Sequence, residues 1–148
     1  MKLDKTTTSI RVLAVDDEEL NNDLVRRTLR TMANVTVVTA TSGQEALEVV
    51  GRLPVDVLLV DQSMPGMTGV EFLEKASVAA PRAVGVMVTG FPELREVMQA
   101  LERGIATQIV VKPWTPAQLI SAVERAVAVR EIQGVTRRLE QYKSGRDK

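Results

Sequence analysis

VDVLLVDQSMPGMTG, residues 55–69, is the stretch that decides the fold of this chain. It is nearly apolar up to Val60, ends abruptly at Asp61, and continues into a turn that contains Pro65 and Gly66. The pattern predicts a central parallel strand over residues 55–60, covered on both faces, with Asp61 at its carboxyl end. In open α/β sheets, ligands bind at that edge. A carboxylate there could bind a metal, act as a nucleophile or cap a turn, and the rest of the sequence must decide between these roles.

The composition limits which chemistry is available. The chain has 148 residues, 45% of them hydrophobic and 3% aromatic, which suits one domain with an aliphatic core. Nineteen basic residues balance nineteen acidic ones, so we expect no direct contact with nucleic acid as the main role. The chain contains no Cys and no His, which excludes disulfides, thiolate chemistry and imidazole ligands. A bound metal would therefore have oxygen ligands, which favours Mg²⁺, Mn²⁺ or Ca²⁺.

The N-terminal residues and the hydropathy pattern bear on location. Residues 1–9 are polar, contain no apolar signal segment, and are predicted to be a flexible leader. No apolar run approaches the roughly 20 residues that a membrane span needs. We therefore expect a cytoplasmic protein that has no membrane partner.

Strand and helix patterns alternate strictly along the chain. We predict strands over residues 10–15, 35–40, 55–60, 83–88 and 108–111, and helices over 19–31, 42–53, 68–78, 92–103 and from 115 to about 128. With right-handed crossovers, this alternation gives a doubly wound, five-stranded parallel α/β sheet with helices on both faces. Residues 10–128 form the predicted domain.

Capping and periodicity give finer expectations for the helices. Capping boxes are predicted at two helix starts, Ser42 with Glu45 and Thr68 with Glu71. Apolar residues at helical spacing are predicted to face the core. In the first helix they are Leu20, Leu24, Val25, Thr28 and Leu29, and in the fourth they are Leu94, Val97, Met98 and Leu101.

Polar residues follow four of the five predicted strands. They are Asp16 and Asp17, Asp61, Thr89, and Lys112. Neighbouring strands lie about 4.8 Å apart, so side chains at the ends of parallel strands can converge on one point. Converging carboxylates repel one another unless a cation lies among them. Together with a lysine and a hydroxyl, they describe a site for a divalent cation and a phosphoryl group, with a carboxylate as nucleophile.

Each of these residues alone has an ordinary explanation. Asp61 and Thr89 are common in turns, acidic residues such as Asp16 and Asp17 favour the start of a helix, and Lys112 could be a solvated lysine. The joint pattern at four strand ends is what is hard to obtain by chance in a chain this short.

Taken together, four motifs resemble the receiver domain of bacterial two-component response regulators over about residues 9–128. They are VLAVDD at 12–17, VDQSMPGMTG at 60–69, VTG at 88–90 and VKPW at 111–114. The resemblance implies a flavodoxin-like fold with strand order 2-1-3-4-5. It also implies that Asp61 accepts a phosphoryl group from a sensor histidine kinase or phosphotransfer protein, and that the change is passed to a downstream effector or output domain. The face formed by residues 92–128 would carry this switch, or a homodimer. No enzymatic activity is implied beyond self-phosphorylation and self-dephosphorylation of the aspartate.

The resemblance also implies a metal site for Mg²⁺ or Mn²⁺. Asp17 and Asp61 would bind the ion directly, together with the backbone carbonyl of Ser63. Asp16 would act largely through water.

Further roles follow from the same resemblance. Lys112 would pair with the phosphoacceptor, Thr89 would move to bond the phosphoryl oxygen, and the bond between Lys112 and Pro113 would be cis. Three features depart from the family pattern: Ile109 stands where the family often has an aromatic residue, the spacing between Gly104 and Lys112 is longer by about one residue, and Trp114 replaces the commoner Phe.

Residues 129–148 are predicted to be a helical extension or a linker. They could form an arm that binds a partner or a second copy, lead to an output domain, or be a frayed helix weakened by Gly134. The apolar residues at heptad-like spacing are Ile132, Val135, Leu139 and Tyr142.

Three other functions fit the sequence less well. An aspartate phosphatase of haloacid-dehalogenase type would need a second Asp two residues after the nucleophile, where this chain has Ser63. A flavin-binding module would need a hydroxyl- and Gly-rich loop after the first strand, whereas residues 16–19 are all acidic. A receiver that signals without phosphorylation is disfavoured because all five polar residues are present.

Overall fold

Five parallel strands form the sheet at the centre of the computed structural model, which describes residues 9–146. The predicted leader, residues 1–9, lies outside the described residues except for Ser9. The strands are β1 (Ile10–Val15), β2 (Val35–Ala40), β3 (Val57–Asp61), β4 (Val84–Thr89) and β5 (Gln108–Val111). Their order is β2-β1-β3-β4-β5, so the predicted doubly wound topology is confirmed. The residues of β3 and β4 are all buried, as expected for central strands covered on both faces.

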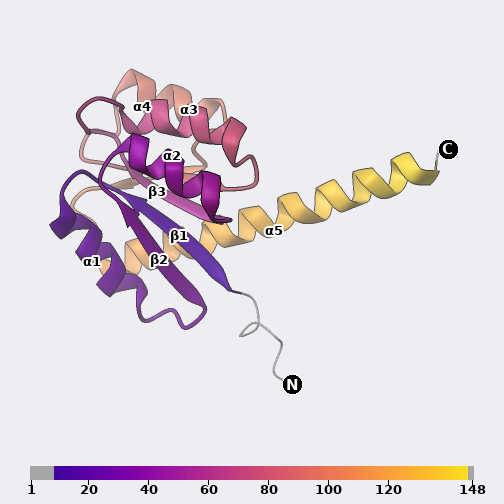
Figure 1. Cartoon of the computed structure of the whole chain (residues 1–148), viewed down its shortest axis with the longest axis horizontal. Coiled ribbons are helices and arrows are strands. Elements are labelled where there is room, and N and C mark those ends of the chain that lie inside the picture. Colours follow the sequence, from indigo (N-terminus) through magenta and orange to yellow (C-terminus); the bar gives the residue numbers. More distant parts are fainter. Residues whose placement is uncertain (1–8, 147–148) are drawn as a thin grey trace.

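Helices cover both faces of the sheet (Figure 1). They are α1 (Glu19–Leu29), α2 (Gly43–Arg52), α3 (Gly69–Ala79), α4 (Arg95–Glu102) and α5 (Pro116–Arg146). Residues of α2, α3 and α4 build one core, in which Phe72 and Leu73 are the largest helix side chains. Residues of α1 and α5 build the other core, around Leu29 and Leu119. Successive residues of β1 and β3 alternate between the two cores: Leu13 and Leu58 join the first core, whereas Val12 and Val57 join the second.

Reciprocal caps begin two of the helices. At α3, the Thr68 hydroxyl accepts from Glu71 N and the Glu71 carboxylate accepts from Thr68 N, so that predicted capping box is confirmed. The predicted box at α2 is only half right. Ser42 Oγ accepts from Glu45 N, but the Glu45 carboxylate accepts from Thr41 N at 2.7 Å. The reason is that Thr41 offers both its N–H and its hydroxyl to the same Glu45 oxygen.

The buried face of α1 differs from the prediction. Leu20 and Leu24 are 82% and 50% exposed, whereas Asn22 is only 3% exposed. The Asn22 amide donates to the carbonyls of Asp16 and Ala40, at 3.0 and 3.1 Å. Because this side chain ties α1 to the ends of two strands, it turns the two leucines outward. The predicted burial of Val25 and Leu29 is confirmed, but Asn22, which hydropathy did not assign to the core, is buried with them.

The fourth helix is shorter than predicted and its apolar face is narrower. It begins at Arg95 rather than Pro92, because the preceding residues form a turn in which Leu94 N donates to Phe91 O. Val97 and Ala100 are buried, but Leu94 and Met98 are 36% and 44% exposed. The prediction that all four apolar side chains face the core was wrong.

The last helix leaves the body of the molecule as a single arm (Figure 1). It is helical from Pro116 through Gly134 to Arg146, with Thr115 and Gln118 capping each other at its start. Beyond the sheet it carries exposed apolar side chains: Ile132, Val135, Leu139 and Tyr142. Within residues 9–146, no helix combines the length and the hydropathy that crossing a membrane requires.

Candidate functional site

Strand register brings the polar strand ends to one point. Val15 of β1 is level with Val60 of β3, so the next residues, Asp16 and Asp61, stand side by side. On the other side of β3, Asp61 is level with Val88 of β4. Lys112 N donates to Thr89 O at 2.9 Å, which places the lysine beside the end of β4. All the side chains predicted to act together are thus at the carboxyl edge of the sheet.

Three carboxylates form the centre of this edge. Asp16, Asp17 and Asp61 each offer an oxygen, and these oxygens all lie within 4.8 Å of one another. Asp16 and Asp61 are buried, both 7% exposed, whereas Asp17 is exposed. The cluster is therefore open to solvent on one side only.

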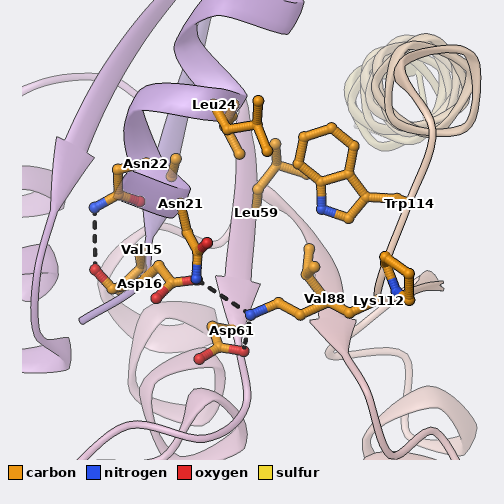
Figure 2. A pocket seen from close by; sticks show the side chains of 13 residues that line it. Val15, Asp16, Asn21, Asn22, Leu24, Leu59, Asp61, Val88, Lys112 and Trp114 are labelled. Carbon is orange, nitrogen blue, oxygen red and sulfur yellow. Dashed lines mark hydrogen bonds and ion pairs between the residues drawn. The ribbon is translucent and has the colours of Figure 1, made fainter. Parts of the chain in front are cut away.

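Lys112 joins two of these carboxylates (Figure 2). Its Nζ lies 2.9 Å from Asp61 Oδ1 and 3.3 Å from Asp16 Oδ2. The lysine reaches them from the end of β5, where the bond between Lys112 and Pro113 is cis, as the resemblance implied. A single ammonium group opposes three carboxylates, so two negative charges remain in excess.

These surroundings shift the pKa values of the two central groups. Burial raises the pKa of Asp61 above its ordinary value of 3.8, and the charges of Asp16 and Asp17 raise it further; the hydrogen bond and charge of Lys112 oppose this and do not fully offset it. Burial acts to lower the pKa of Lys112, but the hydrogen bond and charge of Asp61, with Asp16, raise it above 10.5. In the absence of a bound cation, the ionised form of Asp61 is thus less stable than that of an aspartate in water.

Thr89 lies at the edge of the cluster and is 1% exposed. Its Oγ1 accepts a hydrogen bond from Phe91 N at 3.0 Å. The hydroxyl proton is not needed for that bond, so the hydroxyl could donate to a further acceptor after a change of rotamer.

Several positioning residues were missed by the sequence reasoning. Asp16 is oriented by two donors, Glu18 N at 2.9 Å and Asn21 Nδ2 at 3.1 Å. Gln62, 4% exposed, holds the loop that follows β3: its carbonyl accepts from Gly69 N and its Oε1 accepts from Val70 N. A polar residue directly after a buried strand was the available signal for Gln62.

Two glycines shape the loop after β3. Gly66 has a φ of +80°, a conformation that favours glycine. A Cβ on Gly69 would lie 2.5 Å from the Asp61 carbonyl oxygen and 2.9 Å from Gln62 Cα. Since both contacts are backbone, the loop can pass this close behind Asp61 only if residue 69 has no side chain. Ser63, the predicted carbonyl ligand, is exposed in this loop.

A hollow of about 400 Å³ opens beside the cluster (Figure 2). Asp61 and Lys112 line its polar end, whereas Leu24, Leu59 and Trp114 line its apolar end. The exposed Leu24 that the sequence prediction placed in the core is thus part of the wall.

The donor set fits a hard divalent cation. Carboxylate oxygens are the ligands that Mg²⁺ prefers, and an ion of charge +2 would balance the excess negative charge. Asp16, Asp17 and Asp61 are the residues that could hold it, with the Ser63 carbonyl as the further predicted ligand.

Comparison with known proteins agrees with this geometry. Residues 12–124 match the profile of the response regulator receiver domain family. The hydrogenase transcriptional regulatory protein HoxA of Cupriavidus necator is 38% identical over 129 residues, 87% of this chain and 26% of that protein. HoxA of Bradyrhizobium diazoefficiens is 34% identical over 126 residues, 84% of this chain and 25% of that protein. The chain thus spans about a quarter of the length of these curated relatives.

Solved structures give the same result. A CheY-like response regulator receiver domain protein from Methanospirillum hungatei superposes with a TM-score of 0.78 at 28% identity, over 85% of this chain and 99% of that one. NtrX from Brucella abortus, solved in complex with ATP, superposes with a TM-score of 0.81 at 25% identity, over 89% of this chain and 30% of that one.

Proposed function

This chain belongs to the response regulator receiver family, and we propose that within it Asp61 accepts a phosphoryl group from the phosphohistidine of a sensor kinase or phosphotransfer protein. The observation that supports this most directly is the convergence of three carboxylates and Lys112 at one edge of the sheet. Asp61 is the only one of the three carboxylates that lies at the end of the central strand β3.

The transfer needs little from the protein besides position and charge. A carboxylate oxygen of Asp61 attacks the phosphorus, a P–O bond forms, and the P–N bond to the donor imidazole breaks, with its electron pair leaving on the nitrogen. Lys112 donates a hydrogen bond to Asp61 Oδ1. Once the carboxylate has reacted, the same ammonium group would donate to the oxygens of the phosphoryl group.

A Mg²⁺ ion held by Asp17, Asp61 and the Ser63 carbonyl, with Asp16 acting largely through water, would supply positive charge to the phosphoryl oxygens. The hydroxyl of Thr89, 1% exposed and now accepting from Phe91 N, would donate to a phosphoryl oxygen. Glu18 N and Asn21 keep Asp16 in place while the charges around it change.

We further propose that residues 92–128 form the surface that reports phosphorylation. Thr89 is directly followed by the turn that leads into α4, so a change of its hydrogen bond with Phe91 N would act on that turn. The exposure of Leu94 and Met98 favours a role of α4 in contacts with another protein. Ile109 packs half-buried against the core of α2–α4 and would have to repack in place of an aromatic residue.

The relatives suggest what such contacts could be. HoxA is described as a transcriptional regulatory protein, and this chain matches about a quarter of it. We propose that the partner of this receiver is an output domain or effector, reached through the residue 92–128 surface or through the arm of α5.

Incubation with Mg²⁺ and acetyl phosphate tests the central proposal. We expect intact-mass spectrometry to show the addition of one phosphoryl group, and Trp114, which lines the hollow beside the site, to change its fluorescence. Asp61→Asn should abolish both changes. Asp23→Asn, which removes an exposed carboxylate on α1, is the matched control and should leave both unchanged.

The same assay separates the alternatives. Addition of the group to the Asp61→Asn protein would refute the proposed acceptor. Steady turnover of phosphate esters would instead favour a phosphatase, although Ser63 stands where such an enzyme needs its second Asp.

A further inference from the structure

Arginines gather at the edge of the sheet opposite the carboxylate cluster. Arg82 lies in the loop before β4, and Arg130, Arg137 and Arg138 lie on the arm of α5. Together they line a hollow of about 270 Å³, along with Gln133, Gly134 and Gln141. We call this the arginine hollow. Every lining residue except Gly134 has a side chain that can donate hydrogen bonds.

The arginine hollow has no acidic lining. An adjoining hollow of about 440 Å³ shares Arg82 and Arg130 and adds Arg52, again with no carboxylate among its lining residues. Among the described lining residues of the two hollows, Arg130 alone is in an ion pair, with its Nε 2.9 Å from Asp56 Oδ1, and Arg52 Nε donates to Glu48 O at 3.3 Å. Within residues 9–146, Arg82, Arg137 and Arg138 have no ion-pair or hydrogen-bond partner for their guanidinium groups. Positive charge is therefore concentrated here in a chain whose net charge is zero.

Two arginines of α5 lie on the side of the helix that faces the sheet. Leu119, Val123 and Ala126 are the buried face of this helix against the sheet. At helical spacing the same face continues as Arg130, Gly134 and Arg137 where the helix passes the edge of the sheet. The exposed apolar side chains of the arm lie on the other side of the helix. Arg130 and Arg137, both partly buried, thus face Arg82 and the body of the protein, and the exposed Arg138 lies beside them in the lining of the hollow.

Gly134 stands where a helix would favour almost any other residue, since Gly in a helix interior costs about 1 kcal/mol relative to Ala. A Cβ at this position would lie 3.7 Å from Nη1 of Arg138, so that guanidinium group lies against the glycine. Because Gly134 has no side chain, the space between Arg130 and Arg138 stays open to the hollow.

We propose that the arginine hollow binds an anion with two adjacent phosphoryl groups, such as pyrophosphate or the diphosphate of a nucleotide. The planar guanidinium fork pairs with two phosphate oxygens at once, which a single ammonium group does not do. The volume suits a small anion, being below that of typical pockets for larger ligands, about 300–1,000 Å³. No aromatic residue lines either hollow, so a nucleobase would find nothing to stack on, and the phosphates carry the binding.

Binding has a consequence for the arm. Arg82 belongs to the loop before β4, whereas Arg137 and Arg138 belong to the part of α5 beyond the sheet. An anion bridging them replaces their mutual repulsion by shared contacts and fixes the arm against the body. Whatever the arm contacts would then be presented in one orientation.

Isothermal titration of the full chain with sodium pyrophosphate tests the proposal. EDTA in the buffer keeps metal away from the carboxylate cluster, so the outcome does not depend on phosphoryl transfer at Asp61. The double substitution Arg82→Gln with Arg137→Gln should weaken binding by at least about tenfold, because each removes charge-assisted hydrogen bonds. The control, Arg27→Gln with Arg30→Gln, removes two exposed charges of α1 and its C-cap and should change affinity by less than about twofold, because these charges act only through long-range screened attraction.

Other outcomes overturn the proposal. Equal weakening in both double variants would mean general attraction to positive charge, and sulfate binding as tightly as pyrophosphate would mean an adventitious ion only. A short single-stranded oligonucleotide that outcompetes pyrophosphate at equal phosphate concentration would assign the surface to nucleic acid instead. ADP binding as tightly as pyrophosphate supports recognition of the diphosphate alone, and tighter binding of ADP supports a nucleotide.

Hydrogen exchange tests the clamp, by which we mean that the bound anion fixes the arm of α5 against the body of the protein. Pyrophosphate should slow amide exchange over residues 130–142 in the wild-type chain and in the α1 control, but not in the Arg82/Arg137 variant. Unchanged exchange in the wild-type arm, despite binding, would contradict the clamp. Should the double variant fail to fold by circular dichroism, Arg138→Gln alone provides the same comparison.

Discussion

Replacing Asp61 with Asn should have two opposite effects on stability. In metal-free buffer the variant should be more stable than the wild type, because burial and two neighbouring carboxylates work against the ionised side chain. In Mg²⁺ the order should reverse, because the variant lacks one of the three carboxylates that could hold the ion.

The size of the metal-free effect follows from the distances. At 4.8 Å, the upper limit of the oxygen separations in the cluster, and with an effective dielectric constant of about 20, two carboxylates repel by about 3.5 kcal/mol. The Lys112 ammonium at 2.9 Å attracts Asp61 by about 6 kcal/mol on the same scale. On this scale the repulsion by Asp16 and Asp17 nearly cancels the attraction by Lys112, so the burial of Asp61, the largest cause of its raised pKa, decides the sign. We expect Asp61→Asn to raise the free energy of unfolding by about 1 kcal/mol, which is roughly 2–4 °C in Tm for a chain of this size.

The pH dependence gives the sign independently. A carboxyl group whose pKa is raised in the folded state binds its proton more tightly there, so the ionised form weakens the fold. The advantage of the variant should therefore be absent below pH 3.8, the ordinary value, and grow as the pH rises through the raised pKa of Asp61.

Urea unfolding at several pH values, in EDTA and in Mg²⁺, measures both effects. Asp23→Asn is the control, because this exposed side chain lies outside the cluster and should show neither. Saturating Mg²⁺ should stabilise the wild type by about 2.7 kcal/mol at a hundred times its Kd. A variant that is less stable than the wild type in EDTA, or equally stabilised by Mg²⁺, would refute the electrostatic reasoning.

Three further predictions concern the groups around Asp61. Lys112→Met should lower the free energy of unfolding by about 2 kcal/mol, because it leaves carboxylates unpaired, and Asp61→Asn in the same chain should restore much of it. Since the pKa of Lys112 is raised, the wild type should keep this contribution below pH 10.5 and lose it as the pH rises through the raised value, which chemical unfolding at alkaline pH can measure. Gly69→Ala should destabilise the fold by about 2 kcal/mol, since the added Cβ meets backbone atoms that cannot move away. The control, Gly51→Ala in α2, has nothing within 4 Å of the added Cβ and should stabilise the fold by about 0.5–1 kcal/mol. Thermal unfolding of both variants distinguishes a steric conflict at residue 69 from a general cost of alanine. Thr89→Ala should still accept a phosphoryl group, visible by mass, but should lose the accompanying change in hydrogen exchange of α4; an unchanged exchange response would exclude the hydroxyl from the switch.

The strands could be predicted from the sequence because burial on both faces requires an uninterrupted run of apolar residues. The apolar runs before Asp61 and Thr89 can be satisfied only at the centre of a sheet, so their ends mark the carboxyl edge. Strict alternation of strands and helices then makes all strands parallel, and the polar residues that follow them must share that edge. The resemblance to a receiver domain rests on those same strand ends, and the family is confirmed.

The helix faces were harder to predict because hydropathy does not register hydrogen bonds. Asn22 is buried since two strand-end carbonyls accept from its amide, and the rotation that this imposes exposes Leu20 and Leu24. Similarly, Gln62 is buried because its amide oxygen and carbonyl complete the start of α3. Both positions depend on backbone groups that are distant in the sequence or hidden in a loop.

The sequence by itself thus determined the order and direction of the elements, the oxygen-rich chemistry of the site and the family, because these follow from local patterns of burial and residue type. Only the tertiary structure decided how close the carboxylates lie, which of them Lys112 contacts, and that burial raises the pKa of Asp61, because these depend on strand register and on packing between distant segments. It also decided that Arg82 and the arginines of α5 face one another, since they are separated by about a third of the chain and meet only where the long helix passes the edge of the sheet.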